Sequence, residues 1–416
     1  MKKVFIKTFG CRTNIVDSQI ITSNLKNNTI VYDEKEADII IINSCTVTNS
    51  ADNRVKSYIN SIKKLANKEL IYTGCGVLTK ADKLYSSGMV DKVFASSSKE
   101  DISSILNSQK RVFQKGNLTH LDKTIIQDIS NKTKAFVKIQ EGCDFRCSYC
   151  VIPYVRGDSR SYQSSQILKQ IDILANSGFK EFVLTGTNIG SYGKNQQNNT
   201  DGFARLLKDI SKIKGVVRIR FGSIEPVQIT DEFKELLDEP WMAKHLHIAL
   251  QHTTKEMLNI MNRRNQLKSD LKLFEFLNQK GYAIGTDFIV GHPGESEAIW
   301  QEAVANFKKF PLTHLHCFRY SKRDGTKSAT MTNQISGDIA KERLKELEYI
   351  TKEKNYAFRQ KQKSLKVLIE QKKDGFFVGY DQYFNHMKIA SNKDIKNRFV
   401  TIDEYQVTKD INIAKI

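Results

Sequence analysis

The sequence lacks the features of a membrane protein and of a secreted protein. No apolar run among its 416 residues approaches the roughly 18–20 residues that a membrane-spanning helix needs. The first residues, MKKVFIK, lack the long apolar core of a secretory signal peptide. We therefore expect a protein without a membrane anchor that works in the cytoplasm.

Cysteine is scarce, and the number of cysteines is odd. Seven cysteines in a chain of this length do not indicate a disulfide framework and favour metal or redox chemistry. The first 130 residues contain no G-x-G-x-x-G fingerprint of a dinucleotide-binding fold. The chain also lacks an obvious Ser-His-Asp set or carboxylate pair for hydrolysis.

Acidic residues are outnumbered by basic ones. The chain has 65 Lys and Arg against 46 Asp and Glu, a formal charge of +19. This excess predicts a polyanionic partner such as nucleic acid, although Lys, Asn and Ile are all abundant and a compositional bias is the alternative. The hydrophobic share of 40% and the charged share of 27% are those of a globular protein, whose length indicates two or three domains.

Three cysteines form a C-x3-C-x2-C pattern at Cys143, Cys147 and Cys150. Thiolates are soft ligands that select iron–sulfur clusters or zinc. A structural zinc site would want a fourth Cys or His, but no histidine lies within about 20 residues and the next cysteine is Cys317. The spacing therefore favours a 4Fe-4S cluster with one iron open to a non-protein ligand; a zinc knuckle or a stapled loop is the alternative.

Three further cysteines each follow a short apolar run near the start of the chain. Cys11, Cys45 and Cys75 come after residues 4–6, 39–42 and 70–72, respectively. Such runs, with helical patterns between them, predict the buried parallel strands of an open α/β sheet in a domain of residues 1–130. Because the carboxyl ends of parallel strands meet at one edge, we expect a second three-thiolate site; ordinary buried cysteines are the alternative.

The middle of the chain alternates strands and helices. Strands are expected at residues 136–139, 182–184, 217–221, 246–250, 284–290 and 315–318. Helices are expected at residues 164–176, 203–210, 231–237, 271–279 and 298–307. This alternation predicts a parallel, partly closed α/β barrel over residues 134–355, with its chemistry at the carboxyl ends of the strands.

The cysteine loop, with Tyr149 before its last cysteine, resembles the signature of the radical S-adenosylmethionine (SAM) enzymes. That family has a (β/α)6 partial barrel with the cluster loop after the first strand, and Cys143 follows residues 136–139 in the same way. The resemblance implies that the open iron binds SAM and that the reduced cluster cleaves SAM to a 5′-deoxyadenosyl radical. It also implies that Tyr149 packs near the cluster and the adenine of SAM.

The resemblance further implies which residues bind SAM as a cofactor; turn formation or helix capping is the alternative for each of them. They are Gly186, Thr187 and Asn188 after the second strand, Ser223 and Glu225 after the third, Gln251 at the end of the fourth, and Asp287 in the fifth. Around Gln251 the chain reads LQHTT where the family usually has Leu-Gln-Ser-Gly, so this loop departs from the family pattern.

A second resemblance covers the first domain. Residues 8–14 (TFGCRTN), 43–48 (NSCTVT) and 73–75 (TGC) are similar to the N-terminal domain of the methylthiotransferases. This similarity implies that the cysteines in these segments hold an auxiliary 4Fe-4S cluster that carries or donates sulfur. The G-C-R-x-N form looks most like the MtaB branch, which acts on N6-threonylcarbamoyladenosine in tRNA. Branches that act on isopentenyladenosine in tRNA or on a ribosomal protein are the alternatives.

Two arginines follow the cluster loop. Arg156 and Arg160 place strong cations where a substrate phosphate or carboxylate would be recognised, and we assign both to the catalytic site. A solvated loop is the alternative. Arg12 and Arg323 are further candidates for binding a carboxylate on the modified base.

Short strand-like runs fill residues 361–416, and the pattern is similar to the TRAM domain, a small RNA-binding β-barrel. Tyr380, Tyr383, Phe384 and Lys388 interleave aromatic and basic side chains, a combination that stacks bases and follows phosphates. A small barrel whose aromatic side chains form its core is the alternative.

Together these features predict an enzyme that converts N6-threonylcarbamoyladenosine at tRNA position 37 to its 2-methylthio derivative. We expect two 4Fe-4S clusters and SAM as cofactors, the tRNA anticodon stem-loop and an electron donor such as flavodoxin or ferredoxin as partners, and a monomer. The alternative from another class is a non-catalytic iron–sulfur protein that binds RNA or senses redox state.

Overall fold

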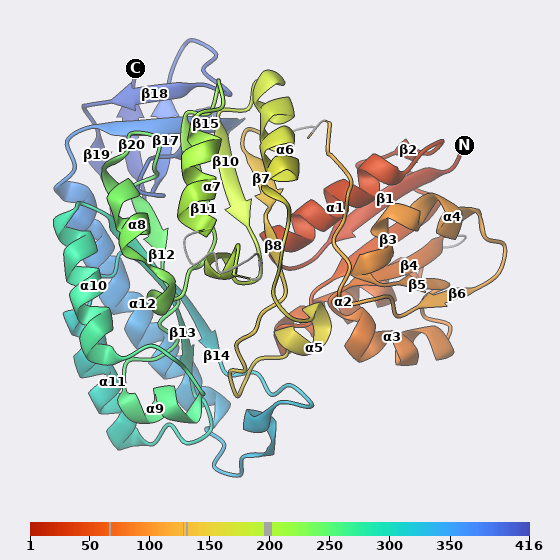
Figure 1. The fold of residues 1–416 in the computed structure, drawn as a ribbon, viewed down its shortest axis with the longest axis horizontal. Helices are drawn as coiled ribbons and strands as arrows, with labels where there is room; N and C mark the ends of the chain where they lie inside the picture. Colours follow the sequence, from red (N-terminus) through yellow and green to blue (C-terminus); the bar gives the residue numbers. More distant parts are fainter. Residues whose placement is uncertain (66–67, 128, 130–131, 195–201) are drawn as a thin grey trace.

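The computed structural model describes residues 1–416 except 66–67, 128, 130–131 and 195–201. Residue 130, the expected end of the first domain, lies outside the described residues, and the predicted domain limits stay predictions. None of the described helices is long and apolar enough to cross a membrane. The two ends of the chain lie on opposite sides of the molecule (Figure 1).

The N-terminal part is a parallel sheet in the order β2-β1-β3-β4-β5-β6. Its strands are β1 (Lys3–Thr8), β2 (Thr29–Ile30), β3 (Ile39–Ser44), β4 (Glu69–Gly74), β5 (Lys92–Phe94) and β6 (Val112–Gln114). Its helices are α1 (Arg12–Asn24), α2 (Asn49–Ile62), α3 (Val77–Ser86) and α4 (Ile102–Asn107). Two apolar clusters bury both faces of the sheet. The predicted open α/β sheet is confirmed.

The central part is the predicted partial barrel. Its parallel strands are β7 (Ala135–Lys138), β10 (Glu181–Thr185), β11 (Arg218–Phe221), β12 (His245–His247), β13 (Ala283–Val290) and β14 (His314–Arg319). They form two three-stranded sheets, which parallel bridges from Ile219 to Met242 and from Ile224 to Ile248 join into one curved wall. The strands β7 and β14 end the series.

Helices surround this wall and pack on it through one large core cluster (Figure 1). They are α6 (Ser164–Asn176), α7 (Gly202–Ser211), α8 (Asp231–Lys234), α10 (Leu267–Gln279), α11 (Glu297–Lys309) and α12 (Gly337–Gln360). Short elements lie in the loops at the carboxyl ends of the strands: β8 (Gln140–Glu141), α5 (Ile152–Arg156), β9 (Arg160–Ser161) and α9 (Lys255–Ile260).

The C-terminal part is a curled sheet in the order β18-β15-β16-β17-β20-β19. Its strands are β15 (Leu365–Lys373), β16 (Phe376–Tyr380), β17 (His386–Ala390), β18 (Phe399–Ile402), β19 (Gln406–Val407) and β20 (Asn412–Lys415). It has a small apolar core of its own, which includes Val367, Phe377 and Ile389. Its assignment as a TRAM domain stays a prediction.

The aromatic residues expected to stack RNA bases lie between the C-terminal sheet and the barrel. The rings of Tyr380 and Phe384 stack with centroids 4.9 Å apart. The Phe384 ring also contacts the ring of His245 at 5.1 Å and the guanidinium of Arg220 at 5.3 Å. Tyr383 packs on Phe358. The three rings therefore help to dock the C-terminal sheet on the barrel. The side chain of Lys388 stays half-exposed.

A buried charge network fixes the first sheet to the barrel. The ammonium of Lys138, at the end of β7, lies 2.8 Å from Asp17 in α1, 3.0 Å from Asp122 and 2.9 Å from Glu141. Lys99 adds ion pairs to Asp17 at 3.4 Å and Asp122 at 3.1 Å. All of these side chains are at most 5% exposed. Buried pairs of this kind are costly to break, so the network holds the two sheets in one orientation.

Candidate active site between two parallel sheets

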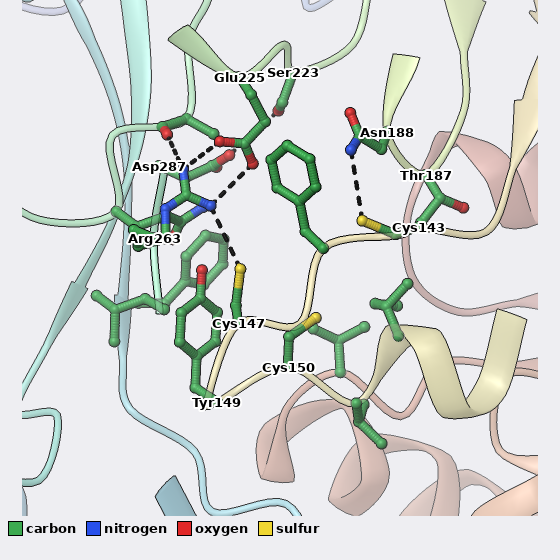
Figure 2. A pocket seen from close by; sticks show the side chains of 18 of the residues that line it. Cys143, Cys147, Tyr149, Cys150, Thr187, Asn188, Ser223, Glu225, Arg263 and Asp287 are labelled. Carbon is green, nitrogen blue, oxygen red and sulfur yellow. Dashed lines mark hydrogen bonds and ion pairs between the residues drawn. The ribbon is translucent and has the colours of Figure 1, made fainter. Parts of the chain in front are cut away.

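The loop with Cys143, Cys147 and Cys150 leaves the barrel directly after β7 and β8 and folds back on itself (Figure 2). Its backbone turns tightly, because the Cys150 amide donates to the Cys147 carbonyl at 3.1 Å and the Cys143 amide donates to the Gly157 carbonyl at 3.0 Å. Gly142 has φ +75°, and a Cβ there would lie 1.9 Å from the Asp158 carbonyl oxygen. Only glycine fits this close approach.

The loop forms one side of a cavity of about 320 Å³ at the carboxyl ends of the barrel strands. The predicted cofactor residues that line it, together with the three loop cysteines, are Tyr149, Thr187, Asn188, Ser223, Glu225, Gln251 and Asp287. Gly186 does not line the cavity. A Cβ at Gly186 would lie 2.9 Å from the side-chain oxygen of Gln140, so its role is to let the chain pass close to Gln140 before Thr187.

Charges in the cavity are largely paired with each other. Arg263 forms a two-pronged ion pair with Glu225, donates to the Ala249 carbonyl, and lies 3.7 Å from the Cys147 sulfur (Figure 2). The side chain of Arg263 is only 2% exposed. The sequence analysis did not identify the pairing of Arg263 with Glu225, since 38 residues separate them in the chain.

Asp287 lies between two imidazoles. Its Oδ1 is 3.1 Å from His247 Nε2 and 3.5 Å from His316 Nδ1, and its Oδ2 accepts a hydrogen bond from Ser223 at 3.2 Å. Burial favours the neutral carboxyl, but the nearby His247 and His316 outweigh it and hold the pKa of Asp287 below its usual range. Asp287 is therefore an anion in the cavity wall.

The residues present fit SAM and a cluster. Asn188 donates to the Cys143 sulfur at 3.5 Å, while its own Oδ1 is buried with no hydrogen-bond partner in the described part of the chain. Such an acceptor suits an ammonium group. The cavity volume is in the range of small-molecule sites, about 300–1,000 Å³. Burial raises the pKa of Cys150 to about 12, and a metal bound to its sulfur would favour the thiolate.

Cys11, Cys45 and Cys75 converge at the carboxyl ends of β1, β3 and β4, as the sequence predicts. The sulfurs of Cys11 and Cys75 each lie 3.8 Å from the same atom, Oδ1 of Asn14. A Cβ on Gly10 would lie 2.7 Å from the Cβ of Cys45. Asn14 is the last residue of the G-C-R-x-N motif, and it anchors the site by donating to the carbonyls of Phe9 and Ser44.

The spacing of the sulfurs favours polynuclear clusters over single ions. Among the described residues, no three cysteine sulfurs lie within 4.8 Å of one another. Two thiolates on one zinc ion, each about 2.3 Å from the metal, can be at most about 4.6 Å apart. The three sulfurs of each triad are therefore not placed to bind one zinc ion together in this structure.

Arg156 lies at the second triad and does not line the cavity. Its guanidinium donates to the Cys75 sulfur at 3.3 Å, to Glu141 at 2.9 Å and to Asn14 at 2.9 Å, and it pairs with Asp17 at 2.9 Å. The side chain is 4% exposed. Protein groups therefore occupy its donors in this structure, and the expectation that it recognises a substrate anion stays a prediction.

The other candidate arginines are engaged as well. Arg160 bonds to Glu141 at 3.3 Å and to the Arg156 carbonyl at 2.9 Å. Arg323 bonds to Asp52 at 2.7 Å and to the Thr46 carbonyl at 3.1 Å, so it ties the barrel to the N-terminal part. Arg12 lies over the Phe384 ring at 5.7 Å. Sequence proximity to the cysteines could not reveal these partners.

The two triads are neighbours in space. Cys75 packs in one apolar cluster with Val151 and Val155, which directly follow the cluster loop. Val47 and Thr48, just after Cys45, line the same cavity as Cys143, Cys147 and Cys150. Two exposed residues that the sequence reasoning passed over, Phe318 and Arg319, also line this cavity.

Comparisons with known proteins agree with this arrangement. Residues 3–95 match Uncharacterized protein family UPF0004, and residues 137–306 match the Radical SAM superfamily. A "Putative methylthiotransferase" of Helicobacter pylori is 50% identical and covers 100% of both chains. The threonylcarbamoyladenosine tRNA methylthiotransferase MtaB of Bacillus subtilis is 30% identical over 97% of this chain and 93% of its own. A tRNA-2-methylthio-N(6)-dimethylallyladenosine synthase of Clostridium novyi is 34% identical over 89% and 86%.

Among solved structures, the radical SAM methyltransferase TsrM from Kitasatospora setae, with cobalamin and a [4Fe-4S] cluster bound, has a TM-score of 0.60 at 12% identity. The match covers 79% of this chain and 77% of TsrM, and it shows a shared fold. The sequence relatives carry the family assignment, and with it the use of SAM and iron–sulfur chemistry. The chain belongs to the radical SAM methylthiotransferase family and is MtaB-like.

Proposed function

We propose that the protein is a cytoplasmic tRNA methylthiotransferase that converts N6-threonylcarbamoyladenosine at position 37 to its 2-methylthio derivative with two 4Fe-4S clusters. The observation that carries this proposal is that one cysteine triad lines the cavity and the other lies beside it, with Cys75 packed on Val151 and Val155 after the cluster loop. One triad sits in the loop after β8, and the other gathers the ends of β1, β3 and β4.

The geometry suggests different roles for the two triads, with SAM chemistry at the loop triad and sulfur delivery at the second. Cys143, Cys147 and Cys150 would hold a cluster that, with SAM bound, would supply the radical chemistry needed at adenine C2, a position neither acidic nor electrophilic. Asn188, Ser223 and Gln251 hold and orient SAM from the cavity wall. Arg263 neutralises Glu225 and brings positive charge to Cys147. Cys11, Cys45 and Cys75 would hold the auxiliary cluster beside the same cavity, close enough for sulfur to be delivered to a base bound there.

The choice of substrate rests on more than overall similarity. Relatives named for threonylcarbamoyladenosine and for dimethylallyladenosine match the chain at 30–32% and 31–34% identity, which do not separate the two. The G-C-R-x-N form at residues 10–14 favours the threonylcarbamoyl branch. The excess of 65 basic over 46 acidic residues fits an RNA better than a protein substrate.

The test is a side-by-side assay of purified, anaerobically reconstituted enzyme on two tRNAs, one with N6-threonylcarbamoyladenosine and one with isopentenyladenosine. Nucleoside mass spectrometry should find the 2-methylthio product on the first and not on the second. Product on the isopentenyl tRNA alone would overturn the proposed substrate, and no product on either tRNA would overturn the proposed reaction.

We further propose that a one-electron donor such as flavodoxin or ferredoxin reduces the loop cluster and that the enzyme acts as a monomer on the anticodon stem-loop. Each candidate donor should support SAM cleavage in place of a chemical reductant. Light scattering of the holoenzyme should give the mass of one chain, 47.6 kDa; twice that mass would contradict the monomer.

A further inference from the structure

The end of strand β14 supplies cavity residues whose side chains are exposed. The strand β14 ends the barrel, since it pairs with β13 alone in its sheet. Its last residues, Phe318 and Arg319, are both exposed and both line the cavity. Neither is needed to complete the core, so their side chains are free to contact a molecule that enters.

Arg319 differs from every arginine considered above. Over the described residues its guanidinium has no hydrogen bond, ion pair or ring contact. Of the two arginines that line the cavity, Arg263 is committed to Glu225, which leaves Arg319 as a cation without an anion. The remaining anion of the wall, Asp287, faces His247 and His316.

The walls next to Arg319 are apolar. Phe318 is 44% exposed, and so is Val47, which reaches the same cavity from the N-terminal part. Exposed apolar groups of this kind suit the face of a flipped-out base, which proteins that read single-stranded RNA stack on aromatic rings. An arginine beside such a surface suits a carboxylate on that base, because its planar donors bind carboxylates in pairs.

We infer that Arg319 binds the carboxylate of the N6-substituent on the target adenosine, while Phe318 stacks on the base. Arg319 would then be the residue that distinguishes a threonylcarbamoyl group from an apolar isopentenyl group. This inference rests on the proposed function and names the specificity determinant of the same site. It replaces the assignment of that role to Arg12, Arg156, Arg160 or Arg323.

The test measures the affinity of the holoenzyme, with SAM, for two anticodon stem-loops that differ only at position 37. One carries N6-threonylcarbamoyladenosine and the other unmodified adenosine. The wild type should bind the first about tenfold to a hundredfold more tightly, the range for one charge-assisted contact. Arg319→Ala should lose this preference, and Arg319→Lys should keep part of it.

Two neighbouring variants serve as controls. Phe318→Ala should weaken both stem-loops by a similar factor, because stacking is common to both bases. Lys322 is exposed, carries the same charge and does not line the cavity, so Lys322→Ala should keep the full preference. Iron content and circular dichroism of each variant establish that its fold and clusters are intact.

The outcomes separate this inference from the proposed function. If Arg319→Ala weakens both stem-loops equally, Arg319 binds the RNA backbone and the inference fails. It also fails if Arg319→Ala keeps the preference of the wild type. In both cases, 2-methylthio product from the threonylcarbamoyl tRNA would leave the proposed function standing. Methylthiolation of isopentenyl tRNA alone by the wild type would overturn both.

Discussion

The first cysteine triad lines the cavity and the second lies beside it, and the two are built in opposite ways. The loop triad lies within eight residues, and its geometry depends on a local turn after β8. The second triad collects cysteines from the ends of β1, β3 and β4, so its geometry depends on the register of a whole parallel sheet. The loop triad is defined by a local sequence motif, whereas the second triad forms only when the sheet is folded.

This difference has a physical consequence. The loop triad should tolerate disturbances elsewhere, because hydrogen bonds within and beside the loop define it. The second triad should respond to any change that shifts a strand end, the orientation of α1, or the buried charges around Asp17 and Arg156. Each prediction below compares one triad with the other, or a variant with a matched control residue.

The largest effect should come from removing the ligands themselves. Replacement of Cys143, Cys147 and Cys150 by Ala should abolish the conversion of SAM to 5′-deoxyadenosine. Replacement of Cys11, Cys45 and Cys75 should retain that conversion and abolish the methylthio product, because sulfur then has no site. Chromatography of 5′-deoxyadenosine and mass spectrometry of tRNA nucleosides measure the two outcomes. Methylthio product from the second variant would show that Cys11, Cys45 and Cys75 are not needed to supply sulfur.

Next in size is the loss of Arg156. Arg156→Ala leaves Glu141 and Asp17 with fewer partners in a buried site, which should lower the free energy of unfolding by about 3–5 kcal/mol. Arg146 is the matched control, since it pairs with Asp158 at the surface, with exposures of 52% and 74%. Arg146→Ala should change stability by less than about 1 kcal/mol. Denaturant unfolding under anaerobic conditions measures both; equal effects would show that the network is not stabilising.

A smaller effect should follow Gly74→Ala, directly before Cys75. Gly74 has φ +91°, and the new Cβ would lie 2.4 Å from the Ser44 carbonyl oxygen. We expect a loss of about 1–3 kcal/mol from strain and a partial loss of iron from the second triad alone. Gly88 has φ +69° with open space around it, so Gly88→Ala should cost less and leave the iron unchanged. Equal iron in both variants would contradict the dependence on strand register.

The smallest effect should come from the seventh cysteine. Cys317 lies in β14, packs against the core of the barrel and does not line the cavity. Cys317→Ala should leave iron content and SAM cleavage unchanged and alter the free energy of unfolding by about 1 kcal/mol. Iron loss in this variant would show that a cluster recruits Cys317.

Much of the architecture could be predicted because parallel strands are buried on both faces and appear as continuous apolar runs. The helix predicted at residues 164–176 is α6 (Ser164–Asn176), and strand β13 differs from its prediction by one residue. Strand β12 is shorter than predicted: it ends at His247, and Ile248 instead bridges to Ile224, where the curved wall joins its two halves.

The site was predictable where a motif is local and not where partners come from distant segments. All cofactor residues except Gly186 line the cavity, because their positions follow from strand ends. The roles of Arg156 and Arg323 were not predictable, since Asp17 and Asp52 lie more than a hundred residues away in the chain. The contacts of Tyr380 and Phe384 were not predictable either. In a sequence, aromatic residues that dock a domain look the same as aromatic residues that stack on bases.

The central claim is that each cysteine triad holds a cluster, and an iron count tests it most directly. The intact protein, reconstituted anaerobically, should hold about eight irons and eight sulfides, four of each in each cluster. Each triple Cys→Ala variant should hold about four, with one cluster signal lost and the other kept in Mössbauer spectra. About four irons in the intact protein, or an unchanged count after replacement of Cys11, Cys45 and Cys75, would contradict the account.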